Sequence, residues 1–208
     1  MLRVGLTGSI GVGKSFVSGV LAELGCRVLD ADETAREVVA IGSKGLQAVV
    51  ATFGKEILTS DGALDRAKLG ELVFADAGKR ATLNSILHPY IIASQDQRLR
   101  EWEALDPKGI AVVDAALMIE SGGYTRFDRL IVVHCREEVQ LERVMTRNHL
   151  SREEAERRIA AQMPQHEKKQ FADYLIDTSD GFTGARERAA EVYEKLREDS
   201  AVKSDPPA

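Results

Sequence analysis

The sequence has few cysteines and no long apolar run. Two of its 208 residues are cysteines, Cys26 and Cys135, and each lies within an apolar run typical of a buried strand. Their wide separation predicts two buried, reduced thiols and disfavours a disulfide or a metal pair. Reduced thiols in turn indicate a cytoplasmic protein. Because no apolar stretch approaches the ~18 residues that a membrane helix needs, we expect no membrane partner.

The chain also lacks an excess of positive charge. It has 28 lysines and arginines against 33 acidic residues, which gives a formal net charge of −5. A protein that wraps duplex nucleic acid needs a broad basic face, so this balance disfavours that class and predicts no nucleic-acid partner. The N-terminus has no feature of a signal peptide, because it begins directly with a strand pattern. These absences favour a compact enzyme, and we expect a monomer.

One short segment carries a strong chemical signal. Residues 8–15 match the phosphate-binding loop pattern G-x-x-x-x-G-K-[ST], with an apolar run before them and helical spacing over 15–24. Glycines let successive backbone N–H groups curl around phosphate oxygens, and the helix start adds its positive dipole end. Lys14 would reach the β- and γ-phosphates, and the Ser15 hydroxyl would bind Mg²⁺. The pattern predicts a nucleoside triphosphate site; a glycine-rich turn before a helix is the alternative.

Strand and helix patterns alternate along the chain. Strand patterns cover residues 2–6, 27–29, 110–113, 130–134 and 174–176, and helical patterns cover 15–24, 31–40, 46–105, 137–147, 152–163 and 185–197. This alternation predicts an α/β fold, a P-loop NTPase-type parallel sheet flanked by helices. The stretch between the second and third strands is too long for one crossover helix. It therefore predicts a helical insertion that binds substrate.

We expect a single P-loop domain over residues 1–200. Its parts are a core of 1–35, 108–137 and 166–200, a helical substrate lobe of about 36–107, and a helical lid of about 138–165. Residues 201–208 have the composition of a frayed terminus and are predicted to form a disordered tail.

Acidic residues close two of the predicted strands, at the edge where such sheets bind ligands. Asp30 and Asp32 end the second strand, and alternation along an extended chain would place both carboxylates on one side. One would orient water on Mg²⁺ and the other would accept a proton from an attacking hydroxyl. A helix cap is an equally good interpretation. Asp114 ends the third strand as a Walker-B acid does, which makes it a possible Mg²⁺ ligand; an exposed strand-end carboxylate is the alternative.

Arginines gather on two consecutive predicted helices. Arg143 and Arg147 are four residues apart on the first helix and share a face. The second helix begins with a capping box at Ser151 and Glu154 and carries the arginine pair 157–158. A planar guanidinium spreads charge over several phosphate oxygens, so this hairpin is predicted to be a lid that closes on phosphates. A solvated charged hairpin is the alternative.

Taken in order, these motifs resemble the dephospho-CoA kinase family. The resemblance is carried by T-G-x-I-G-x-G-K-S at 7–15, D-A-D at 30–32, H-P at 88–89, and R-x-x-x-R-N-x-L-S-x-E-E-A-x-x-R-I-x-x-Q at 143–162, with weaker matches at 53–54, 61–74 and 172–177. The family transfers the γ-phosphate of ATP to the 3′-hydroxyl of the ribose in dephospho-CoA. The resemblance therefore implies an ATP-dependent kinase of coenzyme A biosynthesis, with ATP as phosphoryl donor, Mg²⁺ as metal and dephospho-CoA as substrate.

The resemblance also implies roles for single residues. Asp32 matches the catalytic base, and Lys14 and Arg143, the latter in the lid, are the other expected catalytic residues. His88 and Pro89 fall in the lobe that receives the substrate. The expected ATP site comprises Gly11, Val12, Gly13, Lys14, Ser15 and Phe16.

Two positions depart from the family pattern. Phe16 stands where the family usually has a small hydroxyl residue, so nucleotide contacts near the α-phosphate could differ. The segment 114–117 lacks the proline that often follows the acid of the third strand. Another small-molecule or nucleotide P-loop kinase is the alternative function. A GTP-dependent switch is disfavoured, because the sequence has no guanine-reading N-K-x-D.

Overall fold

The structure is a computed structural model that describes residues 1–74 and 76–204. It divides the chain into two compact units. The sheet unit comprises Met1–Leu29 and the described residues from Trp102 on, and the helical unit is Asp30–Glu101. The helical unit overlaps most of the insertion that the sequence predicted at about 36–107.

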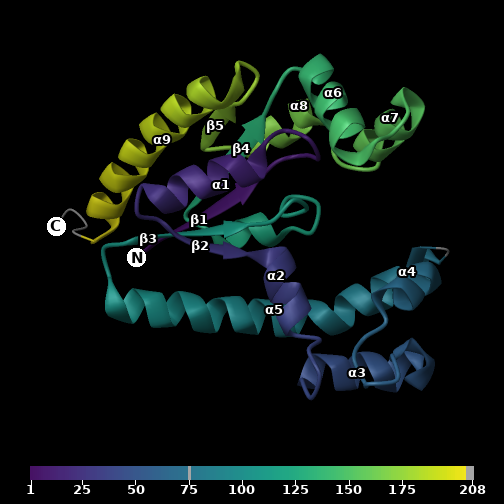
Figure 1. The fold of residues 1–208 in the computed structure, drawn as a ribbon. Coiled ribbons are helices and arrows are strands. Elements are labelled where there is room, and N and C mark those ends of the chain that lie inside the picture. Colours follow the sequence, from purple (N-terminus) through teal and green to yellow (C-terminus); the bar gives the residue numbers. More distant parts are fainter. Residues whose placement is uncertain (75, 205–208) are drawn as a thin grey trace. The chain divides into compact units, whose positions relative to one another are not determined.

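The described part of the chain forms one five-stranded sheet, in the order β2-β3-β1-β4-β5 (Figure 1). The strands are β1 (Leu2–Thr7), β2 (Arg27–Asp30), β3 (Ile110–Asp114), β4 (Arg129–His134) and β5 (Tyr174–Asp177). β1 pairs in parallel with β3 and with β4, and β4 pairs in parallel with β5. Each predicted strand is confirmed to within one residue at either end.

The strands were predictable because the sheet is buried on both faces. All five residues of β3 are buried, as are the four central residues of β4. Parallel strands covered on both sides read as continuous apolar runs, which separate clearly from helical periodicity. Cys26 and Cys135 are buried and free, as predicted. Burial raises the pKa of the Cys26 thiol to about 12.

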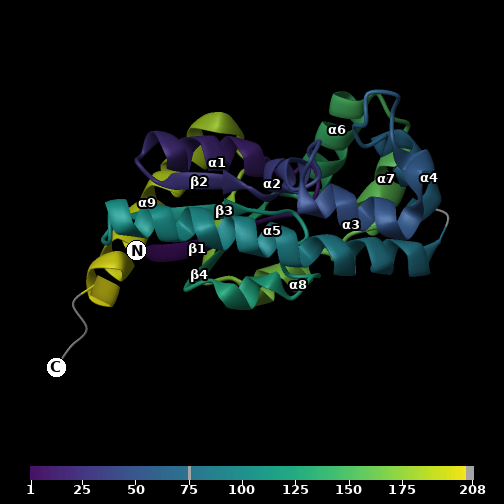
Figure 2. The same cartoon turned by 90° about the horizontal axis from the view of Figure 1, so that it is seen from below.

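Helices of the sheet unit complete its core. They are α1 (Lys14–Glu23), α6 (Glu137–Asn148), α7 (Arg152–Ala160), α8 (Gln165–Lys168) and α9 (Gly181–Ser204), with short 3-10 turns η2 (Gly123–Arg126) and η3 (Lys169–Phe171). α1 and α9 pack side by side against the strands (Figures 1 and 2). Val17 and Leu21 of α1 and Leu196 of α9 are fully buried in this core. In the described residues, no helix is both long and apolar enough to cross a membrane.

Two helix ends differ from the sequence prediction. α7 ends at Ala160 and not at 163, because Pro164 follows and caps the next short helix. α9 begins at 181 and continues to 204, so residues 201–204, predicted to be disordered, are helical. Residues 205–208 of the predicted tail lie outside the described residues.

The sequence predicted helical patterns over 31–40 and 46–105, and the described residues of this region form four α-helices. They are α2 (Ala31–Glu37), α3 (Lys44–Phe53), α4 (Arg66–Phe74) and α5 (Ala77–Leu105), with the turn η1 (Lys55–Ile57). Gly54 has φ 88°, a left-handed conformation that ends α3, and Leu58 forms an isolated antiparallel bridge with Leu64. Val49, Ile57 and Leu69 form the small core of this unit.

Candidate functional site

The loop between β1 and α1 has the conformation that its glycines predict. Gly11 has φ 80° and Gly13 has φ 84°, and both values are left-handed. A Cβ atom at Gly11 would lie 2.6 Å from Cγ2 of Val144 and 3.0 Å from the carbonyl oxygen of Gln140. The backbone therefore passes too close to α6 for a side chain at residue 11.

Side chains from distant parts of the sequence hold the loop in place. The Ile10 N–H donates to Oε1 of Gln162 at 2.7 Å, and Nε2 of Gln140 donates to the Ile10 carbonyl oxygen at 2.8 Å. Gln165 in turn donates to Oε1 of Gln140 at 2.6 Å. Both backbone polar groups of one loop residue, Ile10, are thus fixed by side-chain amides of the α6–α8 segment. A loop held in this way needs little reorganisation when it binds phosphate.

The lysine of the loop faces the acid of the third strand. β1 and β3 pair with Leu6 opposite Asp114, which brings the end of β3 beside the loop. Lys14 Nζ forms an ion pair with Asp114 Oδ1, and their side chains are 18% and 7% exposed. Asp114 is therefore a buried partner of Lys14, and the alternative of an exposed strand-end carboxylate is wrong.

The oxygen atoms at this end of the sheet suit a hard cation. Ser15 presents an exposed hydroxyl in the first turn of α1, and Asp114 contributes a carboxylate beside Lys14. Mg²⁺ prefers a few such oxygen ligands and completes its shell with water and substrate phosphates. The residues predicted to hold Mg²⁺ fit the ion in chemical type.

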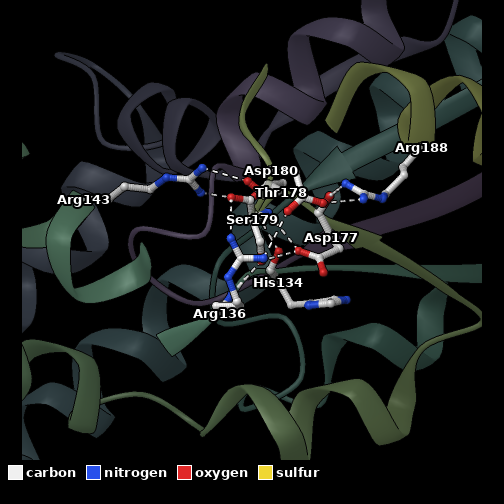
Figure 3. A network of polar contacts seen from close by, with 8 residues as sticks. All are labelled: His134, Arg136, Arg143, Asp177, Thr178, Ser179, Asp180 and Arg188. Carbon is white, nitrogen blue, oxygen red and sulfur yellow. Dashed lines mark hydrogen bonds and ion pairs between the residues drawn. The ribbon is translucent and has the colours of Figure 1, made fainter. Parts of the chain in front are cut away.

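Arg143 lies beside the loop because Thr178 holds it there (Figure 3). The guanidinium donates from Nη1 to Thr178 Oγ1 at 2.9 Å and from Nη2 to the Thr178 carbonyl oxygen at 2.8 Å. The Thr178 hydroxyl itself donates to the Val12 carbonyl oxygen at 2.6 Å. A Cβ at Gly13 would lie 3.5 Å from Nη1 of Arg143. The fork is therefore fixed next to the loop, whereas Arg147 on the same helix is exposed.

The segment after β5 continues this network (Figure 3). Asp180 pairs with Nη1 of Arg136 at 3.0 Å and with Nη2 of Arg188 at 2.6 Å, and these two guanidinium groups lower its pKa. Burial alone would raise the pKa of Asp177, but hydrogen bonds from the Ser179 hydroxyl and N–H outweigh it and lower the value. Charged side chains thus fix the backbone of 177–180 against the loop.

The two acids of the D-A-D motif have different roles. Asp30 ends β2 and caps α2, because its Oδ1 accepts the N–H of Asp32 at 2.7 Å and that of Glu33 at 3.2 Å. Asp32 lies in the first turn of α2, so the expectation of two carboxylates on one side of an extended chain is wrong. The carboxylate of Asp32 is exposed and has no side-chain hydrogen bond or ion pair among the described residues.

His88 and Pro89 lie within α5 of the helical unit, where both are exposed. Proline has no N–H to donate, so the Ser85 carbonyl lacks its usual helical partner four residues on. α5 nevertheless continues through Pro89. Both residues keep a surface position from which they can meet a ligand.

Comparison with known proteins agrees with this geometry. The model of the dephospho-CoA kinase family matches residues 2–183, most of the chain. A dephospho-CoA kinase of Carboxydothermus hydrogenoformans is 44% identical over 93% of this chain and 94% of its own length. The chain belongs to the dephospho-CoA kinase family. Membership makes it a kinase, as the sequence predicted, and the P-loop α/β fold class is confirmed.

Solved structures show the same fold. The dephospho-CoA kinase of Campylobacter jejuni superposes with a TM-score of 0.72 at 26% identity, covering 95% of this chain and 98% of that one. A crystal structure from Thermus thermophilus gives a TM-score of 0.80 at 30% identity, covering 94% and 97%. The family resemblance therefore extends through both units.

Residues 114–117, which lack a proline after the acid of β3, are held by a buried lysine that was not predicted from the sequence. Lys168 of α8 is fully buried, and its Nζ donates to the Ala116 carbonyl oxygen and pairs with Glu120, both at 2.8 Å. The Thr7 hydroxyl also donates to Ala116 at 3.1 Å. A lysine in a polar stretch gives no signal of burial, because its charge is normally exposed. The supporting residues Gln140 and Thr178 are also buried, and they were missed because polar side chains are mostly exposed.

Proposed function

We propose that the chain transfers the γ-phosphate of ATP to the ribose 3′-hydroxyl of dephospho-CoA. The observation that carries this proposal is the loop itself, with Lys14 paired to Asp114 and the Arg143 fork beside Gly13, in a chain of this family. Phosphoryl transfer depends on in-line positioning and on neutralising the equatorial oxygens, more than on covalent assistance. These loop and arginine groups supply that function.

On the donor side, the loop and the start of α1 bind the triphosphate. The amides of 11–16 surround the phosphates, and the Lys14 ammonium leaves Asp114 or bridges from it to the β- and γ-oxygens. Arg143 then neutralises charge on the transferring group with its planar fork. Ser15 and Asp114 would hold Mg²⁺, which would neutralise part of the phosphate charge when bound.

On the acceptor side, we assign Asp32 as the general base. Its carboxylate is exposed and unpaired, so it can accept the proton of the ribose hydroxyl as the oxygen attacks phosphorus. Asp30 supports this assignment, because its own oxygen is occupied by the cap of α2. The helical unit, with His88 and Pro89 on α5, is assigned to the body of the acceptor.

The hairpin of α6 and α7 is assigned as the lid. Its capping box is present, since Ser151 Oγ accepts the Glu154 N–H and the Glu154 carboxylate accepts the Ser151 N–H. The two helices are joined by residues 149–151, as the sequence predicted. Closure of about 138–165 would exclude water and prevent ATP hydrolysis.

ATP turnover with and without dephospho-CoA tests the proposal. We expect ADP and coenzyme A to form together with ATP and dephospho-CoA, and little ADP without the acceptor. A parallel panel with GTP, nucleoside monophosphates and other metabolites addresses the alternative of another small-molecule kinase. Faster transfer to any of these acceptors than to dephospho-CoA would contradict the assignment.

We also propose that the enzyme is cytoplasmic and monomeric. The two buried, free thiols support a reducing compartment. Light scattering coupled to size exclusion measures the mass directly, with 22.8 kDa expected for one chain.

A further inference from the structure

We infer that Phe16 and Phe182 form the surface on which the base of the donor nucleotide stacks. This inference rests on the proposed function, since it presumes a nucleoside triphosphate in the loop. Phe16 directly follows Ser15 of the phosphate loop, and its ring contacts that of Phe182.

Phe16 lies at the nucleoside end of the phosphate site. Lys14 reaches the β- and γ-phosphates, while the backbone amides at the helix start hold the α-phosphate. The nucleoside is joined to the α-phosphate and must therefore leave the site near the first turn of α1, where Phe16 lies. Phe16 is partly buried against the main core, so its ring has a fixed position.

Phe182 places a second ring against the first. The two ring centroids are 4.8 Å apart, with the planes inclined at 52°. Thr178 anchors this segment to Val12 through its hydroxyl, and four residues later Phe182 meets Phe16 at the start of α9. The aromatic pair is thus tied to the phosphate loop at both ends of residues 178–182.

The exposure of Phe182 leaves its ring open to a ligand beside the loop. Its side chain is 75% exposed, although a phenylalanine gains stability only from the area that it buries. A planar, neutral nucleobase is a chemical group that such a ring accepts, since every base offers a π-face for stacking. Inorganic triphosphate, which has no base, cannot use the ring pair.

Binding of ATP and of inorganic triphosphate to the full chain, measured by calorimetry, tests the inference. Phe182→Ala should weaken ATP binding on the order of 10-fold, within the usual range for stacking on one ring, and leave triphosphate binding unchanged. Phe182→Tyr, which keeps a ring, should bind ATP nearly as wild type. Phe171→Ala is the matched control, because Phe171 is also an exposed phenylalanine in a ring pair, with Tyr124.

Each outcome decides one question. If Phe182→Ala binds ATP as tightly as wild type, or loses triphosphate and ATP binding equally, the stacking surface is disproved and the proposed function stands. If the wild-type chain binds neither ligand, the proposed function itself fails. A thermal melt of Phe182→Ala that matches wild type shows that the start of α9 is intact. Phe16→Ser, which removes the other ring, should reproduce the loss of ATP binding without a loss of triphosphate binding.

Discussion

The phosphate loop and the first turn of α2 differ in whether their functional polar groups already have hydrogen-bond or ion-pair partners. At the loop, Asp114 holds Lys14, Thr178 holds Arg143 of α6, and glutamine amides hold the backbone N–H and C=O of Ile10. In α2, Asp30 is occupied by a local cap and Asp32 is left exposed and unpaired. Groups that stabilise charge benefit from being fixed in advance, whereas a general base must keep its lone pairs free for the proton. Each prediction below tests one side of this comparison.

The largest loss of activity is expected when a group that is already held at the loop, Lys14, is removed. Lys14→Ala should lower kcat/KM by roughly 10³-fold, because it removes a donor aimed at the transferring phosphate. It should also lower Tm, since the ion pair between Lys14 and the buried Asp114 is lost. Steady-state kinetics and a thermal melt measure both, with Lys195→Ala, an exposed lysine of α9, as control. Near-normal turnover by folded Lys14→Ala would remove the loop lysine from the mechanism.

A somewhat smaller loss of activity is expected when the exposed carboxylate of Asp32 is replaced. Asp32→Asn should lower kcat by about 10²-fold, the usual contribution of a general base, with ATP affinity retained. Asp30→Asn is the matched control, because asparagine caps a helix nearly as well as aspartate and should cost little activity. The assignment is reversed if Asp30→Asn abolishes turnover and Asp32→Asn does not.

Arg143 tests whether a fixed arginine acts in the transition state. Arg143→Ala should reduce kcat on the order of 10-fold, the value of one charged hydrogen bond, and change ATP affinity less. Arg143→Lys should restore little, because a point charge cannot reproduce the two contacts to Thr178. Arg147→Ala, exposed and four residues on, should resemble wild type. Equal losses for both arginines would support a general effect of charge on the hairpin.

Hydrogen exchange sharpens the proposal for the lid. Amide exchange over residues 138–165 should slow when ATP and dephospho-CoA are both present, since closure buries exposed helix. Exchange in α9 is the internal reference. If the hairpin exchanges at the same rate with and without ligands, it is the solvated charged pair of the alternative interpretation.

The smallest expected effect is a pH dependence of folding stability caused by His134, at the end of β4. Burial, followed by repulsion from Lys169, lowers the pKa of His134 below its usual 6.5 in the folded protein. As pH falls, His134 therefore takes up a proton in the unfolded chain before it does so in the folded protein. Folding stability decreases as pH drops through about 6.5. A modest decrease in Tm between pH 7.5 and 5.5 should be reduced in His134→Gln. His149→Gln, at an exposed position, should keep the wild-type slope.

Much of the fold was predictable because its signals are local. The five strands are visible as apolar runs. The capping box at Ser151 and the glycines at 11 and 13 each predict a local conformation from a few neighbouring residues. The helical insertion was predicted as a region but not divided correctly, because Gly54 ends a helix without any change in apolar spacing. The last turn of α9 was missed because exposed helix ends resemble frayed tails in composition.

The candidate site divides in the same way. The loop, Asp114 and Arg143 were proposed as site residues from the sequence alone, because short motifs indicate their chemistry. The ion pair of Asp114 with Lys14 and the buried Lys168 were not, since each joins residues about 50 to 100 positions apart. Spacing alone left Asp30 and Asp32 equivalent, although the family resemblance implied Asp32 as the base, and the structure shows which of the two caps α2.

The sequence by itself determined the fold class, the phosphate loop and the family, because strand periodicity and motif spacing are properties of neighbouring residues. Only the tertiary structure decided which groups are held and which are free. Gln140, Gln162 and Thr178 reach the loop through parallel pairing of strands and packing of α6, contacts that chain connectivity does not encode locally. The exposure of Phe182 beside Phe16 has the same origin, since two helix starts distant in sequence meet only when α1 and α9 pack together.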